Sequence, residues 1–359
     1  MWGRPTVPGG VIRRHSWKWL AGCVAASAGL IWFLYAQLSA HGFDWRLAAR
    51  SFEQLHGTWL ALSLVPIAGT YAVRALRWQI FLKPLKPQSS FVRIFRATLI
   101  GFAAISLFGR PGEFVRPYLI AVKEGVPATS QFAAWLLERI FDLLMALLVF
   151  AYALSRVQAS GVQVGPQLTW VLKTGGRIVL LASVAILVTL LSMRHFAEPF
   201  RKALLRWLRF LPERHWVKAE RWVTACVLGV ESARSDAALV GIFLYSVLEW
   251  ILVAACYWCL ALAFSGLIHM SLVDVLIFMG FVSFGSAVQI PGIGGGVQVV
   301  AVLVLTELFG VRLEVATTFA LLIWMITFVV VSPVGFVLAL NEGLNWQSLR
   351  RLGAEAAVR

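Results

Sequence analysis

Residues 99–135 read LIGFAAISLFGRPGEFVRPYLIAVKEGVPATSQFAAW, and residues 278–324 read FMGFVSFGSAVQIPGIGGGVQVVAVLVLTELFGVRLEVATTFALLIW. Gly-Phe, Pro-Gly, Gly-Val, Ala-Thr and Trp occur in both stretches in the same order. The spacing between the copies grows from 179 residues at the first shared glycine to 189 at the shared tryptophan. Because Gly and Pro interrupt helices, the pattern predicts two broken apolar segments, at about 91–109 and 272–309, that form an internal repeat.

The composition around these segments is typical of a membrane protein. Of 359 residues, 60% are hydrophobic and 14% are charged, and the mean hydropathy is +0.79. A soluble domain carries about 25% charged residues, so we count this chain in spans of about 20 residues. Six runs are long enough to cross a bilayer: about 18–38, 58–82, 130–155, 171–193, 237–264 and 315–340. The first run follows a basic start without an evident cleavage signal, so we expect it to be retained.

The distribution of Lys and Arg sets the expected topology. With the N-terminus in the cytoplasm, 23 of the 32 basic residues fall in inside segments, six fall outside and three lie within spans. A single crossing at 91–109 would move the basic loop 194–221 outside, against the positive-inside rule. We therefore expect 91–109 to enter and return, or to pair with 110–124, on the cytoplasmic side, and both termini to be cytoplasmic. At 272–309 a re-entrant hairpin and two crossings are equally compatible with the charges.

These patterns predict an all-α polytopic membrane protein. We expect six transmembrane helices plus two broken re-entrant helical segments in a 3+3 inverted repeat. The chain, 1–359, would form a single membrane domain whose repeats cover 15–160 and 165–342. Such inverted repeats are typical of secondary transporters, whose sites lie between the halves. A basic amphipathic helix at 194–222 is expected to lie on the cytoplasmic face.

The first break carries the most unusual charges. In RPGEFVRPY, residues 110–118, Arg110 and Arg116 present forked donors that match the oxygens of a phosphate. Glu113 lies three residues before Arg116 and would share a helical face with it. A cytoplasmic turn whose arginines only set topology is the alternative, but it gives Glu113 no role. We predict a lipid head-group site that includes these three residues.

Ionisable residues within the spans form a second group. Burying such groups in a bilayer is costly, so they usually face a partner or a cavity. Glu138 and Asp142, at i and i+4, share a face of the third predicted span and need cationic partners. The predicted head-group site is therefore extended by Arg74, Arg77, Glu138, Arg139 and Asp142. A structural ion-pair network is the alternative, and Arg77 could instead extend to the interface. Glu249, in the middle of the fifth predicted span, is the deepest buried acid.

The second break is rich in glycine. Its predicted turn residues are Gln289, Pro291, Gly292, Gly294, Gly295, Gly296 and Gln298. Glycine permits positive φ and close approach of the backbone to a ligand, and the following helix N-terminus would favour an anionic group. Close helix packing through small residues explains the same glycines equally well.

Several kinds of function are not supported. The chain has no GxxxxGK[ST] and no HExxH, so neither a Walker A site nor zinc-protease chemistry is predicted. Cys256 and Cys259 form a CxxC inside an apolar span, where buried thiols are common. The net charge of +15 has no soluble fold that would present it to nucleic acid. We expect no catalytic residues, no metal, no cofactor and no nucleic-acid partner.

Three motifs together resemble a known family. They are R-P-G-E-x-x-R-P at 110–117, E-R-x-x-D at 138–142 and P-G-x-G-G-G at 291–296. These motifs resemble the transmembrane region of bacterial lysylphosphatidylglycerol synthase/flippases and its stand-alone flippase-like relatives, over about 15–342. The resemblance implies a bacterial inner-membrane protein. In two-part members the membrane region is thought to flip an aminoacylated phospholipid that a soluble domain makes. The sequence lacks such a domain, so we expect no aminoacyl transfer.

The expected function is flippase-like lipid translocation, with the head group in a charged cavity between the inverted halves. The expected partner is a membrane lipid with an anionic or zwitterionic head group. The resemblance agrees with an aminoacylated, a hopanoid-related or a polyprenyl-linked lipid. It also allows a separate lipid synthase as a protein partner. Two alternatives stay open: an intramembrane lipid-modifying transferase, and a non-transporting lipid-binding scaffold for an envelope-lipid synthase.

Overall fold

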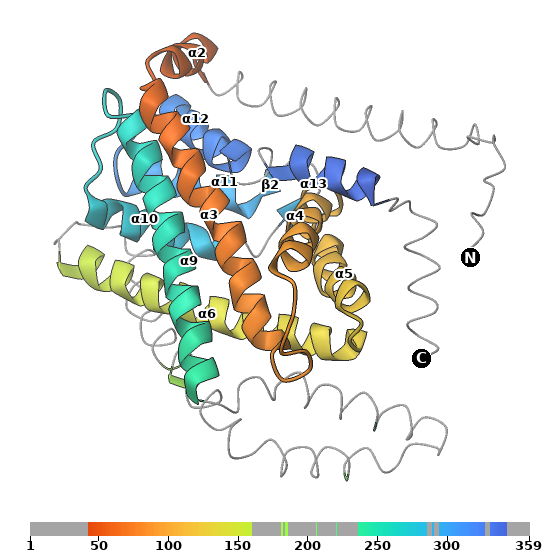
Figure 1. The fold of residues 1–359 in the computed structure, drawn as a ribbon. Helices are drawn as coiled ribbons and strands as arrows, with labels where there is room; N and C mark the ends of the chain where they lie inside the picture. Colours follow the sequence, from red (N-terminus) through yellow and green to blue (C-terminus); the bar gives the residue numbers. More distant parts are fainter. Residues whose placement is uncertain are drawn as a thin grey trace, which may run out of the picture.

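The computed structural model describes residues 42–159, 236–285, 289–290, 294–326 and 331–342, with a few isolated positions. This part of the chain is nearly all helical (Figure 1). Three of its helices are long and apolar enough to cross a membrane: α3 (Gly57–Leu82), α6 (Ala128–Ala159) and α9 (Asp236–Ala263). They confirm the helices predicted at 58–82, 130–155 and 237–264. The spans predicted at 18–38 and 171–193, and the basic helix at 194–222, lie outside the described residues apart from isolated positions.

The two long helices α3 and α9 lie side by side (Figure 1). A small residue allows close approach, because a Cβ added to Gly241 of α9 would lie 2.9 Å from Ile80 Cδ1 of α3. The same pairing brings Arg77 of α3 within hydrogen-bond distance of Ser246 of α9. The contact between α3 and α9 therefore positions charged residues as well as apolar ones.

The first broken segment forms a helical hairpin. Its arms are α4 (Phe91–Phe108) and α5 (Val115–Glu124), joined by a 3-10 turn, η1 (Arg110–Phe114). The prediction of an interrupted helix at 91–109 is wrong, because α4 is continuous and the break begins at Gly109, where φ is 67°. Gly101 serves packing instead: a Cβ there would lie 2.6 Å from Arg116 Cβ, so the glycine lets α5 approach α4.

The second broken segment also forms a hairpin. Its arms are α10 (Leu272–Gly285) and α11 (Gly296–Glu307). The turn contains β1 (Gln289–Ile290) and β2 (Gly294–Gly295), which pair antiparallel. The arms meet closely at Gly285, where an added Cβ would lie 2.5 Å from the carbonyl oxygen of Gly296. Backbone-to-backbone packing thus holds the turn end of this hairpin together.

The span predicted at 315–340 is described as two shorter helices. They are α12 (Leu313–Trp324) and α13 (Val331–Asn341), and residues 327–330 lie outside the described part. A short amphipathic helix that was not predicted, α2 (Trp45–Glu53), packs against α12.

Each hairpin packs its first arm against a helix from the other part of the chain. α4 contacts α13, and α10 contacts α6. Glycine permits both contacts. A Cβ added to Gly335 of α13 would lie 2.7 Å from Ala103 Cβ of α4. A Cβ added to Gly280 of α10 would lie 2.9 Å from Ala153 Cβ of α6. Each hairpin is therefore in contact with the part of the chain to which it does not itself belong.

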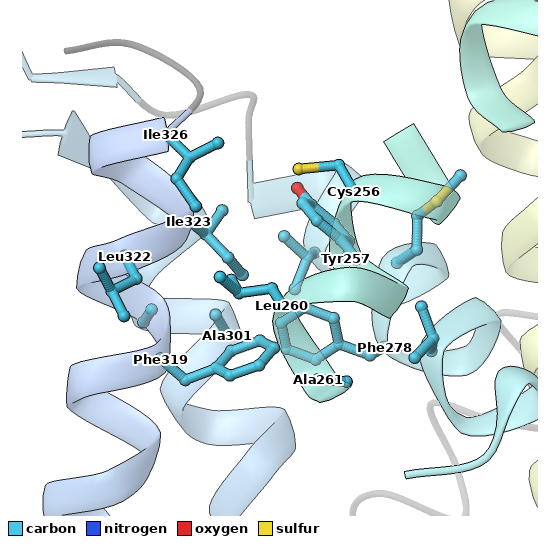
Figure 2. Packing of buried hydrophobic residues seen from close by; sticks show 14 of the residues in the cluster. Cys256, Tyr257, Leu260, Ala261, Phe278, Ala301, Phe319, Leu322, Ile323 and Ile326 are labelled. Atoms are coloured by element: carbon cyan, nitrogen blue, oxygen red, sulfur yellow. The ribbon is translucent and has the colours of Figure 1, made fainter. Parts of the chain in front are cut away.

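Buried aromatic side chains join α9, α10 and α12 into one core (Figure 2). The ring centroids of Tyr257 and Phe278 are 5.8 Å apart, and those of Phe278 and Phe319 are 5.6 Å apart. Both pairs pack edge to face, the arrangement that the ring quadrupoles favour. This core gives α9 a fixed position two turns beyond Glu249.

Candidate functional site

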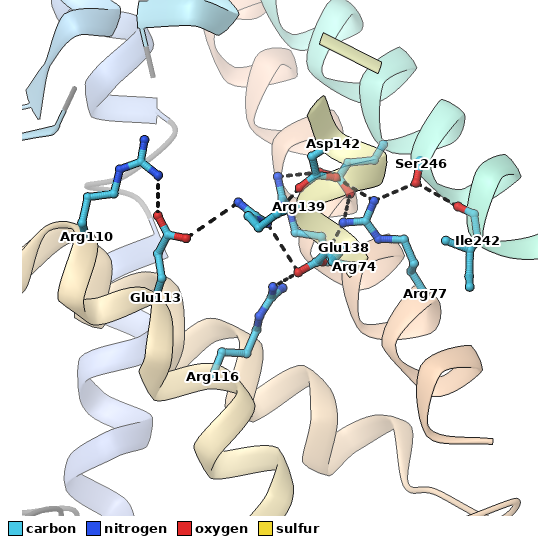
Figure 3. A network of polar contacts seen from close by, with 11 residues as sticks. Arg74, Arg77, Arg110, Glu113, Arg116, Glu138, Arg139, Asp142, Ile242 and Ser246 are labelled. Atoms are coloured by element: carbon cyan, nitrogen blue, oxygen red, sulfur yellow. Dashed lines mark hydrogen bonds and ion pairs between the residues drawn. The ribbon is translucent and has the colours of Figure 1, made fainter. Parts of the chain in front are cut away.

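Arg77 is the centre of a buried ion-pair network. Its side chain is 0% exposed, which excludes the interpretation that it extends to the membrane interface. Nη2 lies 2.6 Å from Oε1 of Glu138 and 3.3 Å from Oε2 of Glu249, and Nη1 lies 2.9 Å from Oδ1 of Asp142. Nη1 also donates to the Ser246 hydroxyl at 2.8 Å. One guanidinium on α3 thus connects carboxylates of α6 and α9 (Figure 3).

Arg74 lies one turn before Arg77 and extends the network along α3. Its Nη2 is 2.5 Å from Oε1 of Glu249, whose side chain is 2% exposed. The Arg74 guanidinium carbon is 4.8 Å from the centroid of the Phe102 ring, within cation–π range. Glu249 is therefore a paired carboxylate shared by two arginines, as a charge buried in a membrane protein requires.

Arg116 joins the first hairpin to the network. It is 4% exposed and forms an ion pair with Glu138 through Nη2. Its guanidinium carbon lies 4.3 Å from the centroid of the Trp78 ring, and Trp78 is fixed in turn by donating to Gln131 at 2.9 Å. The buried Arg116 Nη1 has no hydrogen-bond partner among the described residues. This nitrogen can donate to an acceptor other than the described residues.

Arg139 connects the buried centre to a more exposed edge. Its Nη2 is 2.8 Å from Asp142 and 3.4 Å from Glu138, and its Nη1 is 4.0 Å from Glu113. Glu113 pairs with Arg110 at 3.0 Å, and the Arg110 side chain is 48% exposed. Charged side chains therefore run continuously from Arg110 to the buried carboxylates (Figure 3).

The structure separates two arginines that the sequence suggested as a pair. Arg110 contacts Glu113 at the exposed edge, whereas Arg116 contacts Glu138 in the interior (Figure 3). The cause is the 3-10 turn, which has three residues per turn and places Arg110 and Glu113 on one face. The next residues belong to α5, so Arg116 points to another partner than Arg110 does.

The network has an excess of positive charge. Five arginines (Arg74, Arg77, Arg110, Arg116 and Arg139) meet four carboxylates (Glu113, Glu138, Asp142 and Glu249), which leaves one formal positive charge. The Nε atom of Arg139 is also buried without a hydrogen-bond partner in the described part. The arginines can donate to the oxygens of one bound anionic group, because paired guanidinium donors bind phosphate and carboxylate strongly.

The predicted second turn forms a different kind of structure. Gly295 donates its N–H to Oε1 of Gln298 at 2.7 Å, which fixes the start of α11. Gln289 pairs with Gly295 through the backbone, and Gly294 and Gly296 flank that contact. Pro291 and Gly292 lie outside the described residues.

Sequence reasoning missed the residues that hold the charged side chains in place. Ser246 lies three residues before Glu249 and so on the same face of α9, a spacing that could have indicated it. Trp78, Gln131 and Phe102 carry no such signal, because aromatic and amide residues are common in membrane helices. Their role follows only from the packing around Arg116 and Arg74.

The fold and this network define a polytopic membrane protein with a buried, arginine-rich centre. No group of three or more His, Cys, Asp or Glu residues suited to a metal ion occurs in the described ranges. The chain belongs to the family of the lysylphosphatidylglycerol synthase TM region, whose model matches residues 19–335. This confirms the predicted family and a membrane protein related to lipids. Comparisons with curated proteins and with solved structures found no match.

Proposed function

We propose that the protein translocates a lipid across the bacterial inner membrane, with the lipid head group held at the ion-pair network. The observation that carries this proposal is the buried Nη1 of Arg116, which has no hydrogen-bond partner in the described part of the chain and belongs to a network with one excess positive charge. An anionic or zwitterionic head group supplies a phosphate oxygen for this donor. Membership of the family supports a lipid as the ligand.

The arrangement of the helices supports alternating access by two inverted halves. In one half α3 precedes the hairpin α4–α5 and α6 follows it; in the other half α9 precedes the hairpin α10–α11 and α12 follows it. Gly125 and Gly310 follow the second arms and have nearly equal positive φ values of 68° and 63°. The first arm of each hairpin packs against a helix of the other half: α4 contacts α13, and α10 contacts α6. In this proposal the hairpins are re-entrant and both termini are cytoplasmic.

The position of the network supports such a mechanism. Arg77 and Arg74 of α3 pair with Glu249 of α9, so the site joins the two halves directly. Arg116 connects the first hairpin to the network through its ion pair with Glu138. A change in the angle between the halves would therefore alter the ion pairs, and a bound head group would favour one arrangement over another.

A leaflet-accessibility assay tests this proposal. Purified protein is reconstituted into liposomes that contain a trace of head-group-labelled phospholipid, and dithionite quenches the label in the outer leaflet. We expect quenching to exceed the outer-leaflet fraction only when the protein is present. Lipid binding without such redistribution would point to a non-transporting scaffold, and a chemically altered lipid would point to a transferase. Either result contradicts the proposal.

A further inference from the structure

A second cluster of charges lies at the end of the molecule where α3 ends and the first hairpin begins. Its basic members are Lys83, Lys86, Arg93, Arg96 and Lys123, which we call the basic surface. They come from the end of α3, the following loop, the start of α4 and the end of α5. None of them belongs to the ion-pair network around Arg77.

Two acids only partly neutralise the basic surface. Glu124 is buried and accepts from Lys86 Nζ at 2.9 Å and from Arg93 Nε at 2.7 Å. Glu342, directly after the end of α13, pairs with Lys123 at 2.5 Å. Among the described residues five cations therefore meet two carboxylates, a formal excess of three positive charges. The acids fix Lys86, Arg93 and Lys123 in place, but they do not balance the surface.

The position of the arginines is unfavourable for the helix that carries them. Arg93 and Arg96 lie in the first two turns of α4, next to the positive end of the helix dipole, and the first turn holds no acidic residue. The Arg96 side chain is exposed and makes no hydrogen bond or ion pair with another described residue. Folding therefore explains Arg93, through Glu124, but not Arg96. An anion from outside the chain would offset both charges.

Apolar side chains accompany the exposed cations. Val92, beside Arg93, is 54% exposed, and Val122, beside Lys123, is 51% exposed. Alternating basic and apolar residues suit the boundary between lipid head groups and acyl chains, where cations meet phosphate and apolar side chains meet the first methylenes. Free phosphate offers no counterpart for the valines.

We propose that the basic surface is a binding site for anionic phospholipid of the surrounding bilayer, separate from the site of the transported lipid. Lys83, Arg93 and Arg96 contact the phosphate groups, and Glu124 keeps Arg93 in position. The first hairpin begins and ends at this surface, so a bound phospholipid stabilises the arrangement of α4 against α5.

A binding assay on the full-length protein in detergent tests this site. The probe is short-chain phosphatidylglycerol, with phosphatidylcholine of the same chain length for comparison, and bound lipid is counted by native mass spectrometry. The variant is Lys83→Gln with Arg96→Gln, because both side chains are exposed and neither contacts Glu124. We expect about fivefold weaker phosphatidylglycerol binding for each charge removed, and unchanged phosphatidylcholine binding.

A matched control comes from the opposite end of α3. Arg46→Gln with Arg50→Gln removes the same charge from α2, far from the basic surface (Figure 1). We expect this control to bind phosphatidylglycerol within about twofold of the parent protein. Three results would overturn the proposal: unchanged binding by the Lys83/Arg96 variant, an equal loss in the control, or full competition by inorganic phosphate at the concentration of the lipid.

Discussion

Arg116 and Glu138 form a buried ion pair that connects the first helical hairpin to the long helix α6. Each side chain has a second attachment: Arg116 stacks on Trp78, and Glu138 also contacts Arg77 at 2.6 Å. The pair is therefore part of a connected structure and not an isolated contact. Because both groups are buried, losing one partner leaves a charge that water cannot solvate.

Glu138→Gln should be strongly destabilising. It removes the carboxylate that Arg77 and Arg116 share, and breaking a buried pair typically costs about 3–5 kcal/mol. We expect Glu138→Gln combined with Arg116→Gln to be less destabilised than the sum of the two single variants, because the double variant leaves no uncompensated Arg116 charge. Thermal unfolding in detergent measures this coupling. Additive effects would show that the two side chains do not interact.

Arg116→Lys should not replace the arginine. A lysine has no planar guanidinium to stack on Trp78, and it cannot present forked donors to Glu138 and a ligand together. We expect loss of about 2 kcal/mol of stability, the magnitude of a desolvated cation–π contact. Arg93→Lys is the comparison, since that side chain is half exposed and should tolerate the change. Equal tolerance at both positions would argue against the stacking role.

Gly101→Ala should disturb the first hairpin. The added methyl group would lie 2.6 Å from Arg116 Cβ and 3.2 Å from its Cα, so α5 must move. We expect a cost of about 1–3 kcal/mol together with weaker lipid binding, because Arg116 shifts with α5. Gly57→Ala is the control: it lies at the start of α3 with nothing within 4 Å of the added atom. Similar melting temperatures for both variants would contradict the close approach.

Stability at low pH should depend on Glu124. Burial alone would raise the pKa of this carboxyl, but hydrogen bonds and charges from Arg93 and Lys86 hold the pKa below its ordinary value. At this carboxyl the unfolded chain then binds more protons than the folded one. The contribution of Glu124 to folding stability is therefore complete above the ordinary glutamate pKa of about 4.3. It is lost as the pH falls through the lowered pKa of the folded state. Glu124→Gln should flatten the fall in melting temperature below about pH 5; an unchanged profile would exclude Glu124 as its source.

The sequence predicted the members of the charged site better than their arrangement. The spacing of Glu138 and Asp142 indicated a shared face that needs cations, and Arg74, Arg77 and Arg116 were the expected candidates. Arg77 and Arg116 both contact Glu138. The separation of Arg110 from Arg116 could not be predicted, because it depends on a 3-10 turn rather than on composition.

The helices, too, were predicted better than the contacts between them. Long apolar runs such as α3 and α9 were predicted within a few residues, although α3 contains Pro66 in its interior. The first break was expected within 91–109 but lies at the end of that segment, because glycine has two uses: Gly101 permits close packing, whereas Gly109 adopts positive φ. Local sequence does not distinguish these uses. The second turn was recognised as a break, but its antiparallel pair depends on contacts between residues on both sides of it.

Lipid redistribution by an Arg116→Ala variant tests the central claim most directly. The parent protein, Arg116→Ala, Arg116→Ala with Glu138→Gln, and the surface control Arg46→Ala are reconstituted in equal amounts after their folding is verified by melting and size exclusion. The double variant removes the head-group donor together with the carboxylate that pairs with it. We predict redistribution at the parent rate for Arg46→Ala and at least about tenfold slower for a folded variant that lacks Arg116. Redistribution at the parent rate by the folded double variant would contradict the account.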